Sequence, residues 1–176
     1  FAVNNQETDR LRISANLSSR ALREIYLPAF EYIVKTAQPW TIMCSYNQIN
    51  AVHSAQNRWL LTDVLRGEWG FRGIVMSDWG AVHTTAKAAL AGMDQESGEQ
   101  LDKQVYFGEL LKEAVQQGEV PFERLSNMVH RILRSLIDKG VFDRPAEKRP
   151  TDYEATAKVA PAAAEAGVVM LMHDGV

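Results

Sequence analysis

At residues 72–80 the chain reads RGIVMSDWG. Residues 74–76 form a short unbroken apolar run, which is typical of a strand buried on both faces of a parallel sheet. The run ends just before a carboxylate and an indole, Asp78 and Trp79. In α/β barrels the residues that carry the chemistry lie at the carboxyl ends of the strands. The stretch therefore predicts a buried parallel strand with a candidate catalytic carboxylate at its end.

The strand pattern alone favours a structural role for these two residues. Asp78 would cap the following helix, and Trp79 would plug the mouth of a barrel. The motifs in the neighbouring stretches, described below, favour a functional role for Asp78 and Trp79 instead.

The length, charge and hydrophobic content of the chain limit which classes of protein it can belong to. The chain has 176 residues and a net charge of −3, from 19 basic and 22 acidic residues, and 46% of it is hydrophobic. These values predict one soluble domain with a sizeable core and give no reason to expect nucleic acid or a membrane as partner. No stretch approaches the ~20 apolar residues that cross a bilayer.

The sequence contains no pattern that predicts a cofactor or a metal. It lacks a glycine-rich phosphate loop, a Cys/His cluster and a His-Glu-x-x-His motif. Cys44 is the only cysteine, so no disulfide forms within the chain. The four histidines are widely spaced, and each is interpreted as a surface or packing residue.

Alternating strand and helix patterns give the fold class. Helical periodicity with apolar stripes predicts helices at residues 18–37, kinked at Pro28, and at 55–66, 84–91, 103–117, 121–140 and 156–165. Strands are expected at residues 40–46, 74–76, 92–94 and 168–172, with a surface segment at 141–152. We expect an α/β fold, a partial (β/α)8 TIM barrel with only the carboxyl-terminal strands and helices, because a full barrel needs eight strands.

Several separated motifs carry a family resemblance. They are MCSYN at residues 43–47, LLTDVLR at 60–66, EWGF at 68–71 and GIVMSDWG at 73–80. Together they resemble glycoside hydrolase family 3, the β-glucosidases and related exo-acting β-glycosidases. The opening FAVNNQETDR, the AGMD at 91–94 and residues 167–176 also resemble family segments in the right order.

The resemblance implies a retaining, exo-acting β-glycosidase that hydrolyses β-linked glucosides or oligosaccharides through a covalent glycosyl-aspartate. Asp78 matches the nucleophile, and Trp79 would offer its ring to the sugar. Tyr46 would orient Asp78 by a hydrogen bond, while Met43 and Arg10 would line the sugar subsite. The plainer interpretations are a buried aromatic for Tyr46 and a solvated loop charge for Arg10.

The resemblance also implies a domain organisation. Residues 1–150 would be the carboxyl-terminal part of a TIM-barrel catalytic domain, and residues 151–176 a linker helix and first strand leading toward a missing second domain. The family's Lys-His pair would precede Phe1 and its acid/base glutamate would follow Val176, so the isolated chain is expected to be inactive. Asp94 and Glu96 are further carboxylates at the expected sheet end.

Two other classes of function remain open. One is a non-catalytic carbohydrate-binding or scaffold remnant of the same fold. The other is an unrelated barrel fragment such as an aldolase-type lyase, but Lys87 and Lys103 fall in helical or loop patterns rather than at strand ends. An incomplete barrel exposes a sheet edge, so we expect self-association, a complementing chain or poor stability.

Overall fold

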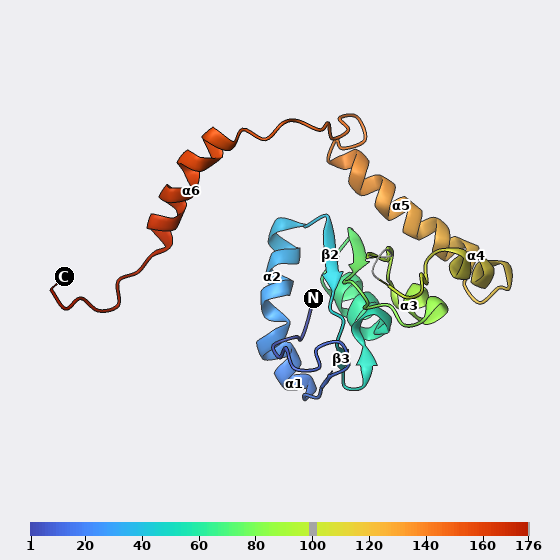
Figure 1. Cartoon of the computed structure of the whole chain (residues 1–176). Coiled ribbons are helices and arrows are strands. Elements are labelled where there is room, and N and C mark those ends of the chain that lie inside the picture. Colours follow the sequence, from blue (N-terminus) through green and yellow to red (C-terminus); the bar gives the residue numbers. More distant parts are fainter. Residues whose placement is uncertain (99–101, 176) are drawn as a thin grey trace. The chain divides into compact units, whose positions relative to one another are not determined.

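The computed structural model describes residues 1–98 and 102–175 and contains both helices and strands (Figure 1). It divides into two units, Phe1–Asp143 and Arg144–Val176, which are described separately. Within the described residues no helix is long and apolar enough to cross a membrane.

The first unit is organised around two parallel strands, β2 (Thr41–Cys44) and β5 (Ile74–Ser77). Their register runs from Thr41 opposite Ile74 to Cys44 opposite Ser77. A parallel bridge between Met76 and Gln95 continues the sheet beyond β5. The strand expected at residues 74–76 is therefore confirmed and extends to Ser77, whereas no strand forms at 92–94 and the single bridge falls at Gln95.

Residues 1–3 lie along the other edge of β2. The Cys44 carbonyl accepts from the backbone of Asp78 beyond β5, whereas the Met43 carbonyl accepts from the amino group of Phe1 at 2.6 Å. Successive carbonyls of a strand point to opposite edges, so the two contacts lie on opposite edges of β2. The Ser45 hydroxyl extends this second edge by donating to the Ala2 carbonyl at 2.7 Å.

A second, smaller sheet consists of three two-residue strands. It has the order β1 (Ser14–Ala15), β3 (Gln48–Ile49) and β4 (Val52–His53), with β3 and β4 antiparallel. Asn50 and Ala51 turn the hairpin with positive φ values of 49° and 66°. The Asn50 side chain accepts from the Leu17 N–H at 2.9 Å, which fixes the turn against residue 17.

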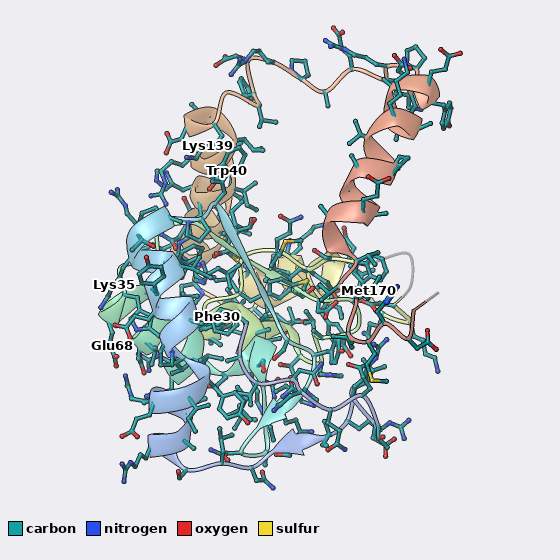
Figure 2. All side chains as sticks on the ribbon, turned by 90° about the vertical axis from the view of Figure 1, so that its left-hand side faces the viewer. Phe30, Lys35, Trp40, Glu68, Lys139 and Met170 are labelled. Atoms are coloured by element: carbon teal, nitrogen blue, oxygen red, sulfur yellow. The ribbon has the colours of Figure 1, made fainter. Side chains whose placement is uncertain are left out.

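The helix expected over residues 18–37 forms in three pieces. They are α1 (Ser19–Ala21), the π-type helix η1 (Leu22–Tyr26) and α2 (Pro28–Ala37), which begins at its proline instead of being kinked within. Phe30 lies on α2 (Figure 2). Its ring contacts that of Phe1 edge to face, with centroids 5.1 Å apart. The predicted apolar stripe is wrong at Ile25 and Ile33, which are 71% and 48% exposed.

The next two helical segments are η2 (Ser54–Gln56) and η3 (Trp59–Glu68). The stripe predicted for this region is confirmed, because η3 buries four residues in the core, Leu60, Leu61, Val64 and Leu65. The predicted end at Gly67 is wrong. The helix continues through it, and the left-handed residue is Gly70, with φ 72°.

Three helices complete the first unit, α3 (Thr85–Ala91), α4 (Glu109–Gln116) and α5 (Phe122–Asp138). α4 is shorter than the predicted 103–117, because the backbone N–H groups of Tyr106 and Phe107 bind the Glu96 carboxylate instead of joining a helix. The apolar stripe of α5 buries Met128, but it leaves Val129, Leu133 and Ile137 between 44% and 53% exposed.

The second unit contains α6 (Tyr153–Gly167), which starts where Asp152 accepts from the Ala155 N–H at 2.9 Å and carries Pro161 inside it. It extends beyond the predicted 156–165 at both ends. The strand expected at residues 168–172 is not formed, and these residues are 71% to 93% exposed. An apolar run needs a neighbouring strand to become part of a sheet, and none of the described residues pairs with it.

Candidate active site

Asp78 lies at the carboxyl end of the parallel pair. Its N–H donates to the Cys44 carbonyl at 3.3 Å, and its own carbonyl accepts from Ala81 at 3.2 Å, which closes a turn. One carboxylate oxygen, Oδ1, accepts the Trp79 N–H at 2.7 Å. Among the described residues, no hydrogen bond or ion pair reaches the other oxygen, Oδ2. The half-buried carboxylate therefore keeps a free oxygen.

Trp79 presents its indole outward, and 62% of the residue is exposed. Gly98 lies against this ring, because a Cβ on Gly98 would be 2.5 Å from Trp79 Cδ1. Gly98 also has φ +84°, a conformation that side chains disfavour. The sequence analysis did not identify Gly98, because a single glycine in a loop does not indicate which side chain it contacts.

Met43 and Tyr46 come from the end of β2, the strand beside β5. Because Cys44 pairs with Ser77, these residues lie at the same end of the sheet as Asp78. Met43 is 48% exposed. The Tyr46 hydroxyl accepts from the Asn4 side chain at 2.9 Å, and no hydrogen bond to Asp78 is found in the described part of the chain. Asn4 is thus a partner that the sequence analysis missed.

Arg10 reaches the Tyr46 ring from the opening segment. Its guanidinium lies 5.5 Å from the ring centroid and pairs with Glu7 at 2.8 Å. The hydrogen bond that Arg10 donates to the Glu7 carboxylate raises the pKa of Arg10, and Tyr46 adds to this effect. Arg10 is exposed, so its fork of donors remains accessible to a polar ligand. The structure thus brings Arg10 to Tyr46, and Trp79 to Asp78.

Cys44 lies beneath this end of the sheet and is fully buried. Burial raises the pKa of its thiol to about 12. The thiol therefore stays protonated at neutral pH and acts as a packing group rather than as a nucleophile.

Asp94 is a structural carboxylate. Its side chain is fully buried, and three guanidinium groups pair with it, those of Arg66, Arg124 and Arg131, at 2.5, 3.0 and 2.9 Å. The Val75 N–H also donates to it at 3.0 Å, which ties it to β5. Both oxygens are engaged, so Asp94 is not available as a site carboxylate.

Glu96 is also engaged in holding the backbone. Its Oε2 accepts from the N–H groups of Tyr106 and Phe107 at 2.8 and 2.6 Å. These bonds fix the segment that leads into α4. Within residues 1–98 and 102–175, no cluster of three or more His, Cys, Asp or Glu side chains could hold a metal ion.

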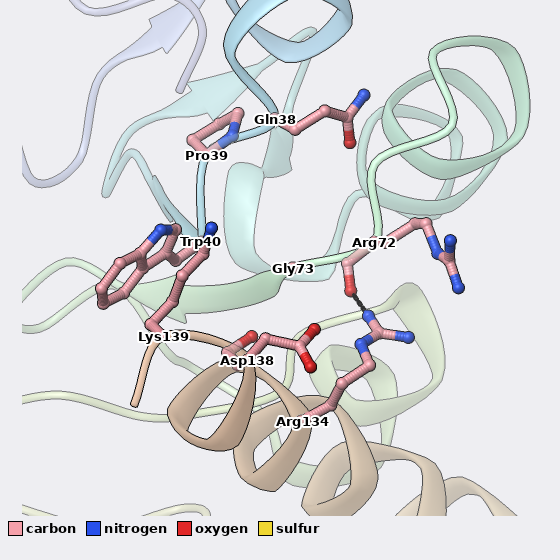
Figure 3. A pocket seen from close by; sticks show the side chains of 9 residues that line it. Gln38, Pro39, Trp40, Arg72, Gly73, Arg134, Asp138 and Lys139 are labelled. Atoms are coloured by element: carbon pink, nitrogen blue, oxygen red, sulfur yellow. Dashed lines mark hydrogen bonds between the residues drawn. The ribbon is translucent and has the colours of Figure 1, made fainter. Parts of the chain in front are cut away.

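A separate pocket of about 220 Å³ lies at the amino ends of β2 and β5, where Trp40 and Gly73 precede the strands (Figure 3). Arg134 donates to the Arg72 carbonyl there, and the Lys139 ammonium lies 5.2 Å from the centroid of the Trp40 ring. Parallel strands place their amino and carboxyl ends on opposite rims. This basic pocket is therefore remote from Asp78.

A half-buried carboxylate beside an exposed indole, at the carboxyl end of parallel strands, is an arrangement suited to carbohydrate chemistry. Residues 11–135 match the model of the glycosyl hydrolase family 3 N-terminal domain. The chain therefore belongs to glycoside hydrolase family 3.

Among curated relatives, an exo-α-(1→6)-L-arabinopyranosidase of Bifidobacterium breve is 51% identical over 99% of this chain and 22% of its own length. A β-glucosidase of Rhizobium radiobacter is 42% identical over 100% of this chain and 21% of its own. The chain thus spans about a fifth of the length of these relatives.

Solved structures of related enzymes agree with the family assignment and with the partial coverage. A Bifidobacterium adolescentis GH3 β-glucosidase has 53% identity and a TM-score of 0.79, over 93% of this chain and 23% of that one. β-Glucosidase 3B of Thermotoga neapolitana, in complex with α-D-glucose, has 39% identity and a TM-score of 0.85, over 98% and 25%. The relatives are glycoside hydrolases, and the chain corresponds to part of each.

Proposed function

We propose that this chain is part of a retaining β-glycosidase in which Asp78 is the nucleophile. The observation that carries the proposal is a carboxylate at the carboxyl end of β5 with one oxygen, Oδ2, unoccupied among the described residues. Oδ2 would attack the anomeric carbon as the glycosidic bond breaks, forming a glycosyl-aspartate. Water would then hydrolyse this ester and restore the carboxylate.

The barrel is the second part of the proposal. Residues 1–3, β2, β5 and the bridge at Gln95 lie side by side in chain order, and helices connect them. This order supports an arc of a TIM barrel within residues 1–150, with residues 151–176 leading toward a second domain. An arc of this kind leaves a sheet edge for the remaining strands.

Four neighbouring residues would bind the sugar. The Trp79 indole would stack on the apolar face of the ring, and Met43 would add apolar contact. Arg10 would donate to sugar hydroxyls, and Tyr46 would hold the opening segment through Asn4. A tyrosine tied to Asn4 can still contact the substrate by its ring edge.

The acid/base carboxyl would come from outside these 176 residues. A retaining glycosidase needs two carboxyl groups about 5–5.5 Å apart. Asp94 is held by three arginines, and Glu96 binds two backbone N–H groups, so neither is free for this role. We therefore expect hydrolysis only when this segment is part of a longer enzyme.

The substrate class would be β-glucosides, with α-L-arabinopyranosides as a second candidate. The β-glucosidase of R. radiobacter supports the first, and the arabinopyranosidase of B. breve, which is the more similar of the two, supports the second. Both readings keep Asp78 as the nucleophile, so the substrate can be tested independently of the mechanism.

The test is a chimera in which residues 1–176 replace the matching segment of the B. adolescentis β-glucosidase. We expect hydrolysis of aryl β-glucosides or aryl α-L-arabinopyranosides, and a loss of about 10⁴-fold or more in Asp78→Asn. Asp63→Asn, at an exposed position of η3, is the matched control and should retain activity. Unchanged hydrolysis in Asp78→Asn would favour a non-catalytic scaffold role.

The exposed apolar residues support a further partner. Three apolar residues of α5 are between 44% and 53% exposed, namely Val129, Leu133 and Ile137. We propose that other copies or a complementing chain cover them. Sedimentation should show association of the isolated chain, and a monodisperse monomer with a sharp melting transition would contradict this.

A further inference from the structure

We propose that His53 and His83 are a positioning pair that holds the Asp78–Trp79 loop against the segment carrying Tyr46. Their rings contact each other with centroids 3.9 Å apart and an interplanar angle of 37°. His83 lies in the loop that follows Asp78, and His53 ends β4. This inference rests on the proposed role of Asp78.

The second half of the loop from residue 78 to 84 is the part that is buried and bonded to residues 53–56. Trp79 is 62% exposed, whereas Ala81 and Val82 are 1% and 4% exposed. His83 then contacts His53, and the Thr84 hydroxyl donates to Gln56 Oε1 at 2.7 Å. Both partners belong to the continuous stretch 53–56, so this stretch anchors the loop.

The anchoring stretch is in turn bonded to the segment around Tyr46. The Ser45 and Ser54 hydroxyls are 2.8 Å apart, and the Ser54 N–H donates to the Asn47 carbonyl at 3.1 Å. Gln48 Nε2 lies 3.3 Å from His53 Nε2. A continuous set of contacts therefore runs from residues 45–48 through His53 to the Asp78 loop.

Burial of the two rings favours their neutral forms. Burial lowers the pKa of His53, and His83 lowers it further, while the Tyr46 backbone opposes this. Burial also lowers the pKa of His83, and Asp102 opposes it. Asp102 is the charged group that faces the pair from the segment after the loop, and its Oδ1 would lie 3.6 Å from a Cβ on Gly80. Two protonated rings at this separation would repel each other and loosen the contact.

The first experiment is NMR on the 176-residue chain. We expect a nuclear Overhauser effect between the His53 and His83 rings, midpoints below 6.5 for both, and a Trp79 indole signal that follows the titration of His83. His83→Phe keeps a flat ring and should abolish the pH response of Trp79, while His130→Gln on α5 should not. Absence of the ring contact, or a Trp79 response that persists in His83→Phe, would overturn the proposal.

The second experiment separates positioning from the proposed chemistry. In the chimera, His83→Ala should lower kcat about 10- to 100-fold with a smaller change in KM, as for a misplaced catalytic group. His83→Phe should recover most of that rate at pH 7 and lose the acid-side response of the pair. If Asp78 proves not to be the nucleophile, the NMR result still decides whether the pair holds the loop. Equal rates in His83→Ala and the parent would contradict positioning.

Discussion

The Arg66 guanidinium and the Asp94 carboxylate lie 2.5 Å apart, with the Asp94 side chain fully buried behind β5. Burial lowers the pKa of Arg66 to about 10, and Asp94 opposes that shift. The same guanidinium donates to the Gly73 carbonyl at 3.0 Å, just before the strand that ends at Asp78. With the Val75 N–H bound to Asp94, this ion pair anchors the amino-terminal half of β5, and the first prediction concerns it.

Asp94→Asn should strongly destabilise the fold, because it leaves three buried guanidinium groups without a counter-charge. Removing one partner of a buried ion pair costs about 3–5 kcal/mol. Urea unfolding of the chain measures the change, with Glu109→Gln, which breaks an exposed pair with Lys112, as the control. A loss no larger than in the control would show that the cluster is dispensable.

Gly98→Ala should displace the Trp79 indole and raise KM in the chimera. The new methyl group would meet the ring at 2.5 Å, and the positive φ adds about 1–3 kcal/mol of strain. Gly118→Ala is the matched control, because Gly118 has a similar φ of +78° but an added Cβ would have no atom within 4 Å. An equal KM in both variants would mean that the ring contact does not affect substrate binding.

Asn4 and Tyr46 should be energetically coupled through their hydrogen bond. We expect Asn4→Ala and Tyr46→Phe each to weaken the fold, and their double variant to show a coupling of about 0.5–1.5 kcal/mol. Urea unfolding of the four proteins completes the cycle. Strict additivity would show that the bond does not fix the opening segment.

Acid should destabilise the chain through the histidine pair. The pKa values of His53 and His83 lie below the ordinary value of 6.5, so the unfolded chain binds more protons as the pH falls. Their contribution is therefore complete above pH 6.5 and decreases progressively below it. The double variant His53→Phe with His83→Phe should reduce the slope of unfolding free energy between pH 6.5 and 4.5, and an unchanged slope would contradict this assignment.

Local hydrophobic periodicity correctly predicted those helices and strands that pack against other elements of the first unit. The run at residues 74–76 becomes β5, and the stripe of η3 is buried as expected, because both pack within the first unit. The same reasoning was wrong for Ile25 and for residues 168–172, which are apolar but have no covering partner among the described residues. Hydrophobicity indicates a need for burial without identifying the surface that provides it.

Long-range partners could not be predicted from spacing. Asp94 meets arginines 28, 30 and 37 residues away, and Asn4 meets Tyr46 across 42 residues. The motif at residues 73–80 identified Asp78 and Trp79, whereas the roles of Glu96 and Gly98 became apparent only from the contacts they make. Motifs locate candidate chemistry, and packing assigns the supporting residues.

Covalent trapping of the chimera with a 2-fluoro glycoside tests the central claim most directly. The account predicts a stable glycosyl adduct, found by peptide mass spectrometry on the peptide containing Asp78 and absent in Asp78→Asn. A label on another carboxylate, or hydrolysis that proceeds without any trapped adduct, would contradict the assignment of Asp78 as the nucleophile.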